Sequence, residues 1–134
     1  MNMELTVTFP GGKKVNAEFK GFTIKTDQPQ TNGGDGTAPS PFDLFLASIG
    51  TCSGVYVLDF CANRGIPLEN VKVTQQIERD SETHMVTGVT IRIDIPEDFP
   101  DKYRDSLVRA VDLCTVKKHI MNPPKFTIEA VKAD

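Results

Sequence analysis

The sequence has no excess of positive charge, and this narrows its range of partners. Lys and Arg number 15 against 18 Asp and Glu, which gives a net charge of -3 at pH 7 and a pI near 5.4. Binding to a nucleic-acid backbone or an anionic membrane needs a basic field that neutralises several phosphates. We therefore expect neither nucleic acid nor membrane among the partners.

Cysteine and histidine are also scarce. There are three cysteines, no CxxC motif and two histidines, His84 and His119, which lie too far apart in the sequence for metal-ligand spacing. An odd and small number of cysteines does not suit a secreted disulfide scaffold. Residues 1–4 lack the cationic and apolar regions of a signal peptide. These features predict a cytoplasmic protein without metal or organic cofactor.

One long apolar stretch, residues 44–58, is interrupted by Ser, Thr and Gly and flanked by acidic residues. This composition favours a helix buried in protein over one buried in lipid. Ser40 and Pro41 supply an N-cap and a first helical residue, and Gly65 and Pro67 supply a stop. The predicted helix has about 24 residues and a length of about 36 Å. Its apolar surface needs cover from a sheet or from a second subunit.

Alternation of apolar and polar residues predicts strands around this helix, and hence an α+β fold. The strand candidates are residues 5–9, 15–20, 22–26, 71–79, 85–95 and 126–131. The second and third, on either side of Gly21, are two strands or one strand with a bulge. The fourth and fifth form a long hairpin. Without repeats or linkers, residues 1–134 are predicted to form a single domain.

A second helix is predicted after the Pro96–Pro100 segment. Its apolar face carries residues at helical spacing, namely Tyr103, Leu107, Ala110, Val111 and Cys114. It runs toward His119 and ends before Asn122. Between the first strands and the long helix lies a Gly- and Pro-rich segment, residues 27–39, which is either a flexible connector or a functional flap.

The cysteines are the candidates for chemistry. Cys52 lies near the middle of the long helix and Cys114 on the apolar face of the second, so both point inward if the helices pack. Cys61 lies nine residues after Cys52, or two and a half turns, and so on the opposite side of the helix. Free cysteine often serves as a small buried hydrophobe, and a reactive thiol needs a nearby cation or helix N-terminus. The residue types alone indicate an α+β domain with buried thiols.

Two segments resemble the OsmC/Ohr-like family. In residues 33–52 a Gly-rich loop precedes a Pro-x-x-Leu helix start, with Cys52 eleven residues after Pro41, and residues 113–118 resemble the second cysteine segment of the family. The predicted order of elements is also similar, and the resemblance covers nearly all of the chain.

This resemblance implies an OsmC-like fold, in which antiparallel sheets wrap around a long central helix and a second helix within an intertwined homodimer. By position, Cys52 matches the peroxidatic cysteine that attacks an organic hydroperoxide. Cys114 matches the resolving cysteine, which closes a disulfide that a small dithiol then reduces. The resemblance thus implies a thiol-dependent peroxidase of the oxidative stress response.

The sequence departs from the family at the activating residues. Peroxidase members have a glutamate after the helix-start proline, where it holds an arginine from the N-terminal region, but here Phe42 follows the proline and no arginine precedes Arg64. Lys25, Lys20 or the partner subunit are the candidates to supply a thiolate-stabilising cation. Phe42 favours an alternative, a non-peroxidatic OsmC-like protein that binds a hydrophobic small molecule or senses redox state. A structural dimer with inert thiols is the third hypothesis.

Overall fold

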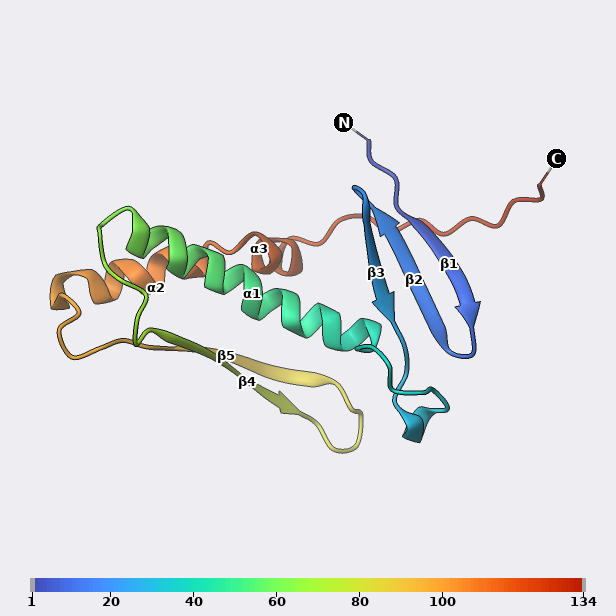
Figure 1. Ribbon diagram of the computed structural model, residues 1–134, viewed down its shortest axis with the longest axis horizontal. Coiled ribbons are helices and arrows are strands. Elements are labelled where there is room, and N and C mark those ends of the chain that lie inside the picture. Colours follow the sequence, from blue (N-terminus) through green and yellow to red (C-terminus); the bar gives the residue numbers. More distant parts are fainter. Residues whose placement is uncertain (1, 134) are drawn as a thin grey trace. The chain divides into compact units, whose positions relative to one another are not determined.

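The structure, a computed structural model, describes residues 2–133 (Figure 1). The chain forms two compact units, one up to Ala47 and one from Ser48. The first holds a three-stranded sheet and the start of a long helix. The second holds the rest of that helix, a β-hairpin and two shorter helices. The predicted α+β class is confirmed.

The first unit begins with an antiparallel meander. Its strands, in the order β1-β2-β3, are β1 (Thr6–Gly11), β2 (Lys14–Phe19) and β3 (Phe22–Thr26). Val7 pairs with Ala17, and Ala17 pairs with Ile24, so their side chains share one face of the sheet. Residues 15–20 and 22–26 therefore belong to two strands rather than to one bulged strand. Lys20 and Gly21 form the turn between them, both with positive φ.

The Gly-rich segment after β3 is closed by its own hydrogen bonds. Asp27 is fully buried, and its carboxylate accepts the Thr37 hydroxyl at 2.7 Å, the Thr37 N–H at 3.0 Å and the Gln28 N–H at 2.7 Å. A Cβ at Gly34 would lie 2.0 Å from the Gln28 carbonyl oxygen, so only glycine fits there. A short 3-10 turn, η1 (Gln30–Asn32), completes the segment.

The long helix α1 (Pro41–Ala62) has 22 residues and begins where the sequence predicts. Ser40 caps its N-terminus, with its Oγ accepting the N–H of Asp43 at 3.2 Å. Gly65, in the left-handed conformation with φ of 63°, follows its C-terminus. The helix is two residues shorter than predicted because its last turn tightens before the glycine.

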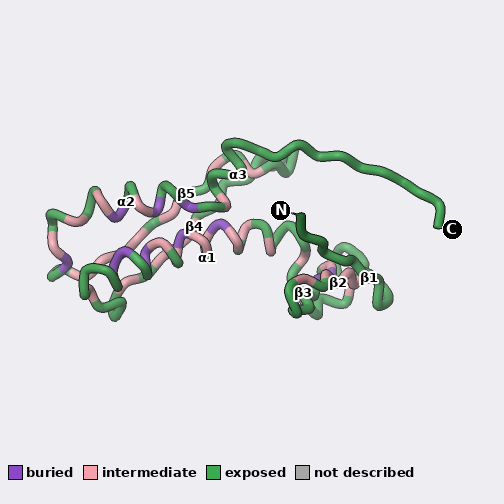
Figure 2. Tube along the Cα trace, turned by 90° about the horizontal axis from the view of Figure 1, so that it is seen from above, coloured by how far each residue is buried: buried purple, intermediate pink, exposed green. Residues whose placement is uncertain are grey.

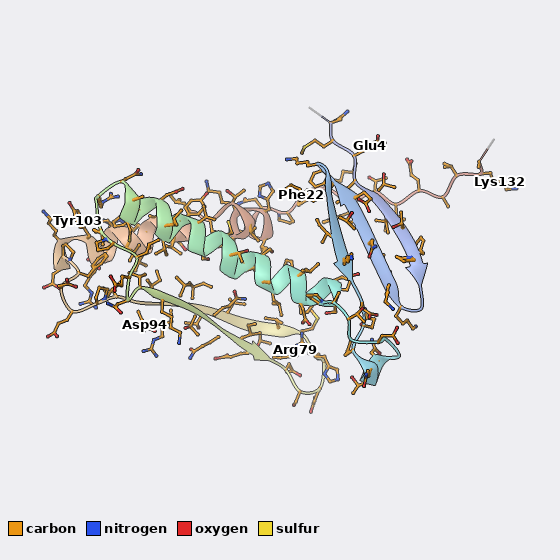
Figure 3. All side chains as sticks on the ribbon, in the orientation of Figure 1. Glu4, Phe22, Arg79, Asp94, Tyr103 and Lys132 are labelled. Carbon is orange, nitrogen blue, oxygen red and sulfur yellow. The ribbon has the colours of Figure 1, made fainter. Side chains whose placement is uncertain are left out.

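The hairpin of the second unit is also as predicted. Strands β4 (Lys72–Arg79) and β5 (Val86–Asp94) pair antiparallel over their whole length, and Arg79 and Asp94 mark its turn end and its open end (Figure 3). Asp80 shapes the turn by accepting the N–H groups of Glu82 and Thr83 on Oδ1.

The core of the second unit joins α1, the hairpin and the helix α2 (Arg104–Asp112). Buried positions follow the facing sides of α1 and α2 (Figure 2). The cluster consists of Val57, Phe60, Cys61, Phe99, Leu107 and Val111, with Val73, Ile91 and Ile93 of the hairpin packed against it. Burial of each large apolar side chain stabilises the fold by about 1.5–3 kcal/mol. This packing fixes the C-terminal half of α1, which follows Cys52.

The prediction of one helix from Tyr103 toward His119 is wrong. The segment holds a 3-10 turn and two helices, namely η2 (Asp101–Tyr103), α2 and α3 (Thr115–Met121). The N–H groups of Leu113 and Cys114 bond to carbonyls three residues back, at 3.2 and 3.1 Å, which tightens the end of α2. Cys114 is then extended, with ψ of 129°, and α3 starts in a new direction.

The predicted last strand, residues 126–131, is also wrong. Among the described residues after Asn122 no strand forms, and Phe126 and Ile128 are 81% and 97% exposed. Apolar alternation suits a strand, but a strand forms only where a neighbour takes up its N–H and C=O groups. No strand of the described chain pairs with this segment.

Candidate active site

Cys52 and Cys114 come together in the second unit. Cys52 is half-buried on α1, and Cys114 is buried at the break between α2 and α3. The thiol of Cys114 donates a hydrogen bond toward the sulfur of Cys52. The structure thus pairs the two residues that the sequence nominated.

The start of α3 surrounds this pair with main-chain donors. The first N–H groups of a helix have no acceptor within the helix and are free to meet another group. Here the N–H groups of Val116 and Thr115 interact with the sulfur of Cys52, and those of Lys117 and Val116 with the sulfur of Cys114. The break after α2 is therefore what supplies donors to both thiols.

These contacts shift the pKa values of the two thiols in opposite directions. Burial by itself raises the pKa of Cys52, but the hydrogen bond from Cys114 and the N–H groups of Val116 and Thr115 outweigh it, so the pKa is lowered. Burial raises the pKa of Cys114 as well, and the bond to Cys52 raises it further, against a smaller opposite effect of the N–H groups. Cys52 is therefore the more acidic thiol of the pair, and the proton is held more firmly at Cys114.

Two side chains hold the first residue of α3 in place. Tyr56 lies one helical turn after Cys52, and its hydroxyl is 2.9 Å from Oγ1 of Thr115. The Nδ1 atom of His119 is 2.7 Å from the carbonyl oxygen of Thr115, and a bond between them requires the proton on Nδ1. Tyr56 thus ties α3 to the same face of α1 that carries Cys52.

An apolar cavity of about 450 Å³ opens beside Cys114. Its walls come from α1, β5, α2 and α3, with Ile49, Ile91 and Val111 among the apolar residues. The polar residues that line it are Ser53, Asp112, Cys114 and Lys117. Asp112 and Lys117 form an ion pair, and the Ser53 hydroxyl donates to the Ile49 carbonyl at 2.9 Å. A cavity of this size and polarity suits a small, largely apolar molecule.

A protein-family model described as OsmC-like protein matches residues 34–129, a range that includes both site cysteines. The chain belongs to this family. The predicted family is therefore confirmed, and the cysteine pair lies within an OsmC-like domain.

Solved structures share the fold of this OsmC-like protein. An osmotic stress induced and detoxification response protein from Psychrobacter arcticus is 24% identical, with a TM-score of 0.72 and coverage of 88% of each chain. An OsmC-like protein from Mycoplasma pneumoniae is 11% identical, with a TM-score of 0.69 over 92% of this chain and 89% of that one. An organic hydroperoxide resistance protein from Legionella pneumophila is 18% identical, with a TM-score of 0.58 over 90% and 89%. No curated protein matches the chain.

Helix α1 of this OsmC-like protein is long and apolar enough, by length and composition, to cross a membrane, and 28% of its most apolar window is buried in the described chain. Core helices of soluble proteins meet the same criterion. Since α1 is the cysteine-bearing helix of a confirmed OsmC-like fold, we interpret it as a core helix.

The other nominated residues lie apart from this thiol pair or in the first unit. Cys61 is fully buried in the core cluster, where burial raises its pKa, as expected from its position on α1. Lys20 lies over the ring of Phe19, 5.2 Å from its centroid, and Lys25 lies in β3. Phe42 stacks on Phe45 at 5.6 Å. The role of the two lysines toward Cys52 stays a prediction.

Sequence reasoning missed the groups that act on Cys52 from α3. Tyr56 could have been found, because a residue four positions after Cys52 shares its helical face. Thr115 and Val116 act through their main-chain N–H groups, which every residue except proline has, so the residue types do not reveal this role. Among residues 2–133, no three His, Cys, Asp or Glu side chains come together in a group that could hold a metal ion.

Proposed function

We propose that this OsmC-like protein is a thiol-dependent peroxidase that reduces organic hydroperoxides through Cys52 and Cys114. The observation that carries the proposal is the pairing of Cys52, whose pKa is lowered, with Cys114, whose pKa is raised, beside an apolar cavity. Similar structures named as organic hydroperoxide resistance proteins support a redox-related function.

The reaction has two steps on the protein. The Cys52 thiolate attacks the terminal oxygen of the hydroperoxide, the O–O bond breaks, and an alcohol and a Cys52 sulfenic acid result. The Cys114 sulfur then displaces the sulfenic oxygen as water and forms a Cys52–Cys114 disulfide. A small dithiol restores both thiols. One hydroperoxide and one dithiol thus become alcohol, water and an oxidised dithiol.

The main-chain N–H groups near Cys52 can take over part of the role of the missing arginine, which is to stabilise the thiolate. Thiolates are stabilised by any nearby positive charge or set of oriented N–H groups. Val116 and Thr115 supply such groups at Cys52, which supports thiolate formation with Phe42 in place of the family glutamate. Lys25 and Lys20 remain the proposed source of an additional cation, from this chain or from a partner.

The assembly and location belong to the same proposal. We place the protein in the cytoplasm, where a reducing environment keeps a thiol pair ready for reaction. We also propose that it works as a homodimer, since both units leave large apolar side chains such as Phe22 and Ile128 exposed.

Steady-state turnover tests the proposal. Wild-type protein with dithiothreitol is expected to consume cumene hydroperoxide, whereas Cys52→Ser and Cys114→Ser lose turnover. Lys25→Met and Lys20→Met show whether either lysine adds to the rate. If the wild type bound an apolar dye in its cavity yet consumed no hydroperoxide, the peroxidase proposal would fail. The alternative, a non-peroxidatic binding protein, would then hold.

A further inference from the structure

The cavity touches only one of the two thiols. Cys114 lines the cavity, and Cys52 lies beside Cys114 without being part of the lining. A hydroperoxide whose alkyl group occupies the cavity therefore directs its oxygens past Cys114 toward Cys52. In that orientation its terminal oxygen would face Cys52, and the oxygen bonded to carbon would lie next to Cys114.

The oxygen next to Cys114 is the one that needs a proton. When a thiolate attacks the terminal oxygen, the electrons of the O–O bond move to the other oxygen, which leaves as an alkoxide. An alkoxide is a strong base, and its departure is helped by a positioned acid. Cys52 cannot supply that proton, because it reacts as the thiolate.

Few groups of the cavity wall are suited to the task. The Ser53 hydroxyl already donates to the Ile49 carbonyl. Asp112 is paired with Lys117, and the side chains of this ion pair are 65% and 46% exposed. Cys114 is buried, with 1% of its surface exposed, and it lines the cavity beside Cys52.

We propose that Cys114 is also the general acid of the first step, donating its thiol proton to the alkoxide as the O–O bond breaks. This inference rests on the proposed function. The step balances: Cys52 thiolate, Cys114 thiol and hydroperoxide give Cys52 sulfenic acid, Cys114 thiolate and alcohol. The sulfenic hydrogen is the one that the terminal oxygen carried.

Proton donation also prepares the second step. Burial and the neighbouring Cys52 raise the pKa of Cys114, so the thiol keeps its proton until the alkoxide forms. Once the proton has left, Cys114 is a thiolate beside the new sulfenic acid, and it is a thiolate that attacks sulfur. The sulfenic oxygen then leaves as hydroxide and becomes water by taking a proton from the solvent. One residue thus acts first as acid and then as nucleophile, in the order that the chemistry requires.

Single-turnover oxidation of Cys52 by two oxidants tests this role. Tert-butyl hydroperoxide releases a strongly basic alkoxide, whereas peroxyacetic acid releases a carboxylate that needs no proton. In Cys114→Ala and Cys114→Ser we expect Cys52 oxidation by tert-butyl hydroperoxide to slow by about 10²-fold, in the range of general acid catalysis. The peroxyacetic acid rate, which reports loss of thiolate stabilisation and of folding, should fall far less.

The ratio of the two rates decides the question. Cys61→Ser, the matched change at the core cysteine, should keep the wild-type ratio. An equal loss with both oxidants in the Cys114 variants would overturn the acid role, and so would a selective loss in Lys117→Met, which would make the ammonium the donor. Failure of the wild type to oxidise Cys52 with either oxidant would instead overturn the proposed function.

Discussion

At the scale of single residues, Cys52 owes its lowered pKa first to the thiol of Cys114 and then to main-chain N–H groups that side-chain chemistry does not reveal. Main-chain N–H groups are rigid and lose no side-chain entropy when they meet a thiolate, whereas a lysine must order a long flexible chain to do so. Val116 and Thr115 therefore fill part of the role that the sequence assigned to a missing cation. Phe42, at the position of the family glutamate, stacks on Phe45 instead.

The core cysteine allows a prediction at this scale. Cys61→Ser is expected to leave hydroperoxide turnover intact, because Cys61 lies in the core cluster. The buried hydroxyl without a partner should lower the free energy of unfolding by roughly 1–3 kcal/mol. Turnover assays with denaturant unfolding check both parts. Loss of turnover as complete as in Cys52→Ser would contradict the placement of Cys61.

The buried carboxylate of Asp27 leads to a prediction about the stability of the protein at acidic pH. The Thr37 hydroxyl, followed by the Thr37 and Gln28 N–H groups, lowers the pKa of Asp27 from 3.8 to about 2. Because the folded pKa lies below the unfolded one, this stabilisation is complete above about pH 4 and is lost as pH falls toward 2. At pH 4 the thermal midpoint of Asp27→Asn should be lower than that of the wild type. As the pH falls from 4 to 2, the midpoint of the variant should decrease less than that of the wild type.

Asp35→Asn is the matched control for that experiment. Asp35 lies in the same segment, but its side chain is 69% exposed and contacts Lys14 at the surface. If both variants followed the wild-type curve, the carboxylate of Asp27 would not close the segment.

At the scale of elements, the break between α2 and α3 is the feature on which the site depends. The apolar spacing from Tyr103 to Cys114 continues through it, so periodicity alone predicted one helix. No proline or glycine marks the break at Leu113 and Cys114. The sequence shows which face of a helix is apolar, but not where the chain leaves the helix between two apolar turns.

The contact between Tyr56 and Thr115 can be tested separately. Tyr56→Phe removes the bond that ties α3 to α1, so the pKa of Cys52 should rise and stability should fall by about 1 kcal/mol. Ultraviolet absorbance of the thiolate against pH measures the first effect. Tyr103→Phe is the matched control. Tyr103 is the second of the two tyrosines in the chain, and its ring packs edge-on against Phe60.

The partner residue completes this test. Thr115→Val in the Tyr56→Phe background should add little, because both changes remove one interaction. A Cys52 titration that is unchanged in Tyr56→Phe would mean that α3 holds its position without this bond.

At the scale of the whole molecule, the sequence predicted individual helices and strands better than the long-range pairing between them. The helix start at Ser40 and Pro41 and the hairpin follow from local capping and alternation, and both are confirmed. The last strand was wrong because pairing is a long-range property. Residues 126–131 have the pattern of a strand without a neighbour in the described chain.

Those exposed segments lead to a prediction about assembly. The first unit exposes Phe9 and Phe22 at 80% and 71%, and the second exposes Phe126 and Ile128. Apolar surface of this extent favours association. Light scattering at micromolar concentration should give twice the chain mass of 14.8 kDa. A mass equal to one chain would defeat the homodimer proposal.

The central claim, that Cys52 and Cys114 form one redox pair, is tested most directly by mapping the oxidised protein. After one equivalent of alkyl hydroperoxide, peptide mapping with intact mass should show an intrachain Cys52–Cys114 disulfide and a free Cys61. In Cys114→Ser, a dimedone-type probe should label a sulfenic acid at Cys52. A Cys52–Cys61 bridge, bridges only between chains, or three unreacted thiols after excess hydroperoxide would contradict the two-cysteine mechanism.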